Sequence, residues 1–215
     1  MARLARFQLL LLLLAGCGQR GPGANQTAAP AQPANQAAAA QDKAAAAPAE
    51  VNLDSALRFT DAAQCRPAPE LRRALDRMLV HDEATDSWRV GGAVTLAGLD
   101  GPLTPRLEVT RSTQDGLRMI DYQSSLDLPA GARWHGLRVR RLVVTHLDVF
   151  ESDDQDQTDI TFAETPATVR RVLGEHGFDV PLHPAYRELD DGACGGAMQI
   201  VAIPGGAALQ CGYGC

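Results

Sequence analysis

The chain has 215 residues and a formal net charge of −6 at pH 7, with 20 basic and 26 acidic side chains. Residues 51–215 hold 16 of the basic side chains, all of them Arg, and 24 of the acidic ones. A domain this acidic is repelled by nucleic acid and by anionic lipid, because proteins bind both through a basic face. The composition therefore argues against a nucleic-acid-binding protein.

The first residues have the pattern of an export signal. Arg3 and Arg6 precede a leucine run over 9–14, which is far shorter than the ~20 residues that a helix needs to cross a bilayer. A short basic segment followed by a short apolar one is typical of a cleaved signal peptide rather than of a membrane anchor. The sequence therefore predicts a signal peptide over residues 1–16.

The end of this segment, Leu14-Ala15-Gly16-Cys17, resembles the lipobox of bacterial lipoproteins. In that family the thiol is acylated and the Cys becomes the first mature residue, so the resemblance implies lipid, including palmitate, on Cys17. Several acyl chains, at ~0.8 kcal/mol per buried methylene, give stable membrane anchoring. Diderm family members with Asp after the Cys stay at the inner membrane, whereas Gly18 here implies the outer membrane, with the domain facing the periplasm. The alternative is an ordinary signal peptide with a chance Cys.

Residues 17–50 are expected to form a flexible tether behind the lipidated Cys. The segment is rich in Ala, Pro, Gln and Asn, and no large apolar side chain occurs in it before Val51. Such a composition cannot bury enough apolar surface to offset the entropy cost of ordering. Residues 18–50 reach at most ~110 Å when fully extended, so the domain of residues 51–215 is expected to stay near the membrane.

Four cysteines follow Cys17, namely Cys65, Cys194, Cys211 and Cys215. An even number in an oxidising compartment predicts two disulfides. The C-x3-C spacing of the last two fits neither a zinc ribbon nor a redox C-x-x-C motif. We expect Cys65 to pair with Cys194 or Cys211. On the chain-entropy model, a closed loop of over about 100 residues contributes ~4–5 kcal/mol.

Apolar spacing predicts two helices. After Pro67 and Pro69, one stripe consists of Leu71, Leu75, Met78 and Leu79. The second helix is predicted to begin with Thr165 as N-cap and Pro166 at the first helical position, and to end at Gly177. Its apolar stripe consists of Val169, Val172 and Leu173.

Alternating apolar residues predict strands elsewhere. We expect short strands near 57–59, 88–96 and 103–109, and a final hairpin of 197–203 and 207–213. A long strand is expected over 137–150. The adjacent Val143 and Val144 interrupt its alternation, which predicts either a bulge or burial on both faces there. Asp115-Gly116 marks a two-residue turn that places Val109 opposite Tyr122 and Arg111 opposite Ile120. The order of elements predicts one α+β domain over 51–215: a mainly antiparallel sheet with two helices packed on one face, stapled by disulfides.

Chemistry-bearing motifs are scarce. The chain has no nucleophile-elbow, phosphate-loop or zinc-protease motif, and its five histidines share no local metal-ligand spacing. We predict neither a metal nor a cofactor. Trp134-His135-Gly136 combines an aromatic ring, a titratable group and a permissive backbone, so Trp134 and His135 are candidate binding residues. Core packing of Trp134 is the alternative.

Residues 151–159 hold the densest cluster of carboxylates, in Glu151, Asp153, Asp154, Asp156 and Asp159. Carboxylates at alternating positions suit calcium, but the EF-hand spacing fails, with no Gly at its sixth position. A solvated loop between strands is therefore the favoured interpretation, and a calcium site is the alternative.

Two functions remain in competition. The first is a non-catalytic binding or accessory module, anchored to the membrane by lipid, with an envelope protein or cell-wall partner. The second is a periplasmic hydrolase whose site brings His135 or His146 together with a carboxylate of residues 151–159, because acid–base pairs need not be close in sequence.

Overall fold

A computed structural model describes residues 49–150, 154–183, 185–190 and 195–214, which belong to one compact unit, Ala45–Cys215. The predicted signal peptide, Cys17 and nearly all of the predicted tether lie outside the described residues, as do Cys194 and Cys215. Within the described ranges, no helix has both the length and the apolar character needed to cross a membrane.

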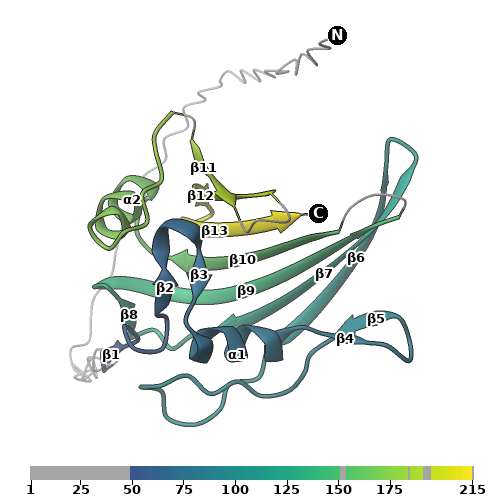
Figure 1. Ribbon diagram of the computed structural model, residues 1–215. Helices are drawn as coiled ribbons and strands as arrows, with labels where there is room; N and C mark the ends of the chain where they lie inside the picture. Colours follow the sequence, from purple (N-terminus) through teal and green to yellow (C-terminus); the bar gives the residue numbers. More distant parts are fainter. Residues whose placement is uncertain (1–48, 151–153, 184, 191–194, 215) are drawn as a thin grey trace, which may run out of the picture. The chain divides into compact units, whose positions relative to one another are not determined.

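A nine-stranded sheet dominates the described part of the chain (Figure 1). Its order is β1-β8-β9-β10-β13-β12-β11, and β7 also pairs with β9 and carries β6 on its outer edge. These strands are β1 (Val51–Asn52), β6 (Arg106–Gln114), β7 (Leu117–Asp127), β8 (Ala132–Trp134), β9 (Leu137–Val149), β10 (Gln155–Phe162), β11 (Tyr186–Asp190), β12 (Gly195–Ile203) and β13 (Gly206–Gly214).

Shorter elements complete the domain. One small hairpin pairs β2 (Phe59–Asp61) with β3 (Arg66–Pro67), and another pairs β4 (Val80–Asp82) with β5 (Ser87–Arg89). The helices are α1 (Pro69–Met78), α2 (Pro166–Glu175) and the single 3-10 turn η1 (Ala62–Gln64). In Figure 1, α1 lies near the two small hairpins and α2 lies beside β11, β12 and β13.

The α+β class is confirmed, and the sheet is mostly antiparallel, but it is a mixed sheet because one pair of strands is parallel. β1 pairs in parallel with β8, with Val51 opposite Ala132, whereas the other paired strands of the described residues are antiparallel. The partner strands β1 and β8 are two and three residues long and far apart in the chain. Neither is long enough to show an alternation that sequence reasoning could read.

Local signals place both helices as predicted. Pro69 begins α1, and the buried side of that helix consists of Leu71, Ala74, Leu75 and Met78. The Thr165 hydroxyl caps α2 by accepting a hydrogen bond from the Thr168 backbone N–H, and Pro166 follows at the first position. Gly177 follows the C-cap residue His176 and has φ +89°, a left-handed conformation that glycine adopts without strain.

The β6–β7 hairpin has the predicted register. Val109 lies opposite Tyr122 and Arg111 opposite Ile120, around a turn in which Asp115 and Gly116 both have positive φ. Burial differs across this pair, because Tyr122 is buried whereas Val109 is 39% exposed. Most residues of β6 are exposed.

Other strand boundaries differ from the prediction. Of residues 88–96 only the first two belong to β5, and Val94 forms an isolated bridge with Leu103. The bulge in β9 lies nearer the start of the strand than Val143-Val144, where it was predicted. Thr161 of β10 pairs with Arg141 and Phe162 with Val139, so Arg140 is the extra residue. Val143 is buried and Val144 packs against the core, so the predicted two-sided burial is present there.

A single core cluster joins the sheet to both helices and to the β2–β3 hairpin. Its centre is aromatic: the rings of Phe59, Phe162 and Phe178 lie 5.8, 6.1 and 5.4 Å from that of Trp134. A disulfide between Cys65 and Cys211, with Cα atoms 6.0 Å apart, ties the region after β2 to β13. One of the two expected partners of Cys65 is thereby confirmed.

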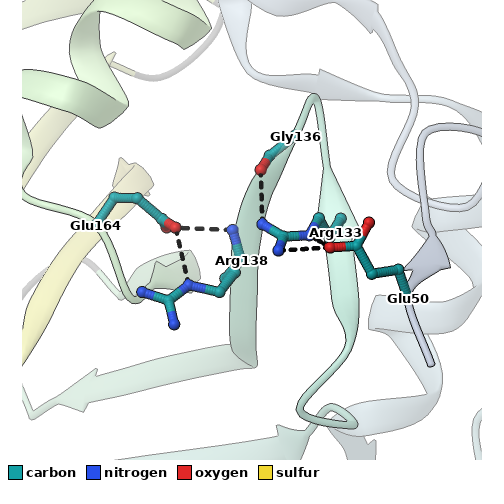
Figure 2. A network of polar contacts seen from close by, with 5 residues as sticks. All are labelled: Glu50, Arg133, Gly136, Arg138 and Glu164. Atoms are coloured by element: carbon teal, nitrogen blue, oxygen red, sulfur yellow. Dashed lines mark hydrogen bonds and ion pairs between the residues drawn. The ribbon is translucent and has the colours of Figure 1, made fainter. Parts of the chain in front are cut away.

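The beginning of the domain is clamped to β8 (Figure 2). Arg133 donates a hydrogen bond from Nε to Glu50 Oε1 at 2.8 Å, and its Nη2 forms an ion pair with the same oxygen at 2.7 Å. Its Nη1 donates to the Gly136 carbonyl. A Cβ on Gly131 would lie 1.9 Å from the Ala49 carbonyl oxygen, so only glycine permits this approach. The predicted tether therefore joins the sheet at β8, beside the start of β9.

Candidate functional site

A cavity of about 490 Å³ lies between α1 and the core face of the sheet. Its walls are mostly apolar: Leu75 and Leu79 come from the α1 side, Val144 and Ile160 from the sheet, and Phe59 from β2. The Cys65–Cys211 disulfide also lines it. We call this space the α1 pocket.

Strand register explains why the α1 pocket stays open. Val144, Thr158 and Cys211 are directly opposite one another on β9, β10 and β13, so their side chains share the core face. All three are small, whereas the next row toward the core centre consists of the larger Leu142, Ile160 and Leu209. The helix ends at Met78 and the chain turns into β4, so no further helical residue fills the gap.

The rim of the α1 pocket carries charges of both signs. Arg66 and Arg72 lie on it together with Asp76 and Asp156. The Arg66 guanidinium donates a hydrogen bond to the Asp190 carbonyl at 3.2 Å, whereas Arg72 is exposed and forms no ion pair with another described residue. An apolar cavity of this size with a few polar groups at its mouth has the usual form of a ligand site.

His146 lies beside this rim, between the carboxylates of Asp156 in β10 and Asp154 just before that strand. Its Nδ1 is 2.8 Å from Asp156 Oδ1 and its Nε2 is 3.8 Å from Asp154 Oδ2. The Trp88 ring covers the imidazole, with centroids 4.1 Å apart, and the side chain is only 7% exposed. The sequence left open whether His135 or His146 meets a carboxylate of residues 151–159, and the structure brings His146 to Asp156. Sequence reasoning missed Trp88, which had been assigned only a place in a strand.

The sequence predicted a loop over residues 151–159. Residues 155–159 instead form the first part of β10. Strand alternation sends Asp156 to the core face and Asp159 to the opposite face, where it accepts hydrogen bonds from Gln157 and Gln210. The described residues contain no group of three or more His, Cys, Asp or Glu that could hold a metal ion. Glu151 and Asp153 lie outside the described residues.

Trp134 and His135, the candidate binding residues, line neither the α1 pocket nor the groove described below. Trp134 is 1% exposed and sits among the core aromatics. His135 has φ +50°, and its ring stacks on His176 with centroids 3.6 Å apart. Its backbone N–H donates to Asp54 Oδ1 at 2.6 Å. Burial, and then the neighbouring His176, lower the pKa of His135, while Asp54 opposes them.

No protein-family profile matches this chain, and neither the characterised proteins nor the solved structures include a significant match.

Proposed function

We propose that this protein is a lipid-anchored component of the cell envelope whose domain is a non-catalytic binding module, with the α1 pocket as its ligand site. The observation that carries the proposal is the apolar cavity of about 490 Å³ with a charged rim. Ligand pockets in proteins share this size and this combination of apolar walls with a few polar groups.

The expected ligand is an apolar group presented by a partner in the envelope, either a protein or a cell-wall component. Phe59, Leu75 and Ile160 provide the apolar contacts. At the mouth, the unpaired Arg72 guanidinium and the Asp76 carboxylate can each bind a polar group of the same partner. The lipid on Cys17 would limit the search to partners near the membrane.

The last residues of the predicted tether contact β8 at Arg133, far along the sheet from the Val144 part of the pocket wall. Arg133 of β8 pairs with Arg138 at the start of β9, whereas the pocket residue Val144 lies six residues further along that strand. At ~3.3 Å per residue, this separates the two points by about 20 Å. The Val144 part of the pocket is therefore not covered by Ala49 and Glu50.

Crosslinking of intact cells of the native host tests the proposal. The full-length protein is compared with Cys17→Ala and with Val144→Phe, which enlarges a side chain in the pocket wall. Val109→Phe makes the same change on the exposed part of β6 and serves as the control. One dominant partner, lost with Cys17→Ala and with Val144→Phe but kept with Val109→Phe, is the expected result. A partner that is unaffected by Val144→Phe would contradict the assignment of the pocket.

The alternative function is a periplasmic hydrolase, favoured by the 2.8 Å contact between His146 and Asp156. Against it, both ring nitrogens of His146 face carboxylates and Trp88 covers the ring, so neither nitrogen is directed at a substrate in the pocket. General-base catalysis needs a nitrogen within hydrogen-bond reach of the reacting proton. Ester, peptide or glycoside hydrolysis by the purified chain that His146→Gln abolishes would establish this alternative.

A further inference from the structure

A second cavity, of about 400 Å³, lies on the face of the sheet opposite the core. Its lining side chains come from β7, β9, β10, β12 and β13, at the end of the sheet where β9 finishes and β10 begins. About half of this lining is polar, and its residues with polar side chains are Asp121, Thr145, Gln155, Asp156, Gln157, Gln199, Gln210 and Tyr213. We call this space the polar groove.

Hydrogen bonds between side chains fix the amides beside the groove. Gln157 and Gln210 each donate from Nε2 to the Asp159 carboxylate, at 2.8 and 3.1 Å, and Gln199 donates to Gln210 Oε1 at 2.9 Å. One N–H of each of these three amides is therefore used within the network. The carbonyl oxygens of Gln157 and Gln199 form no hydrogen bond with another described residue, so they can accept one from a ligand.

Glycine keeps the floor of the groove open. Gly212 lies directly opposite both Gln157 and Ala197 across its two neighbouring strands. A Cβ at Gly212 would be 3.7 Å from Gln157 Oε1, so any larger side chain would occupy the space in front of that acceptor. Gly214 continues the floor at the next position on this face.

Asp121 carries the negative charge of the β7 wall. Its Oδ1 is buried and has no hydrogen-bond partner within the described ranges. Burial raises the pKa of this carboxyl. No Arg is among the residues that line the groove. A buried acceptor without a donor is costly, and a charged one costs more.

We propose that the polar groove binds a cationic hydrogen-bond donor, an ammonium or guanidinium group, with Asp121 as its counter-charge and the Gln157 and Gln199 carbonyls as further acceptors. Such a group supplies several N–H donors and a positive charge at once. A neutral hydroxyl would pair with the carboxylate but leave its charge uncompensated. The inference does not depend on the α1 pocket or on the proposed function.

Both a free polyamine and the Lys or Arg side chain of a partner polypeptide carry this chemistry. Calorimetric titration of residues 18–215 at pH 7 distinguishes them, with spermidine in one arm and N-acetyl-lysine amide and N-acetyl-arginine amide in the other. N-acetyl-glutamine amide is the uncharged control. Binding of spermidine alone would identify a free amine as the ligand. Binding of the capped amino acids would identify a side chain.

Asp121→Asn keeps the shape of the groove and removes its charge. Asp115→Asn makes the same change in net charge at the exposed turn of the same hairpin, where Asn is compatible with the positive φ. A charge-assisted hydrogen bond to this partly buried carboxylate predicts about a tenfold to hundredfold loss of affinity for Asp121→Asn. Asp115→Asn is expected to change the affinity less than twofold.

Gly212→Val fills the floor without changing any charge and keeps the inference testable if Asp121→Asn does not fold. It is expected to abolish binding of the cationic probes. Three results would overturn the inference: no cationic probe binds, both Asn variants weaken binding equally, or Gly212→Val binds as tightly as the native chain. Equal weakening would mean general attraction to an acidic domain.

Discussion

The Cys65–Cys211 disulfide is expected to supply a large share of the stability of the domain. It closes a loop with a sequence separation of 146 residues. The chain-entropy model assigns a crosslink of this span about 5 kcal/mol at 25 °C. Domains are usually stable by only about 5–15 kcal/mol in total, so loss of the bond should bring the domain close to unfolding.

Urea unfolding of residues 18–215 measures this contribution. Cys194→Ala and Cys215→Ala are included in every form, so that Cys65 and Cys211 are the only cysteines. Because both are buried, Ala is the appropriate replacement. Either single variant, Cys65→Ala or Cys211→Ala, removes the whole bond. Each single variant and the double variant should therefore lose about the same 5 kcal/mol.

Comparing the stability loss of the double variant with the losses of the two single variants tests this reasoning. If the two cysteines contributed only as separate buried side chains, the cost of the double variant would be the sum of the single costs. A sum of that kind, or a loss below about 1 kcal/mol in all three forms, would show that the crosslink does not constrain the unfolded chain as argued.

Three further predictions concern the core and two titratable groups. Phe162→Ala, at a fully buried ring that packs on Trp134, should lower the free energy of unfolding by about 3–5 kcal/mol in urea titrations; a loss near zero would contradict the core assignment. Burial raises the pKa of Asp159, so its contribution to stability is present below pH 3.8 and is lost as pH rises through its folded-state pKa. Asp159→Asn should therefore raise Tm at pH 7 but not at pH 3, and a lower Tm at pH 7 would mean that its hydrogen bonds outweigh its desolvation. Burial lowers the pKa of His135, so its contribution to stability is present above pH 6.5 and is lost as pH falls through its folded-state pKa. His135→Gln should therefore reduce the fall of Tm between pH 7 and pH 5. An unchanged dependence of Tm on pH would refute this.

The features that sequence alone determined are local ones. Thr165, Pro166 and Gly177 specify the ends of α2 through the backbone conformations and hydrogen bonds available at helix ends. Asp115-Gly116 specifies the register of the β6–β7 hairpin, because a two-residue turn leaves only one alignment of its strands. The lipid on Cys17 is also a local prediction, made from four consecutive residues that lie outside the described structure.

The tertiary structure alone decided which distant residues meet. Nothing in the chain near Val51 indicates a parallel partner at Ala132, and the polar stripe that forms the groove is spread over five strands. His146 and Asp156 meet only because β9 and β10 pair in one particular register, which also sends Asp159 to the opposite face. Caps and turns are determined by energies between neighbours in sequence. Pockets and grooves depend on strand order and register, which the whole core selects at once.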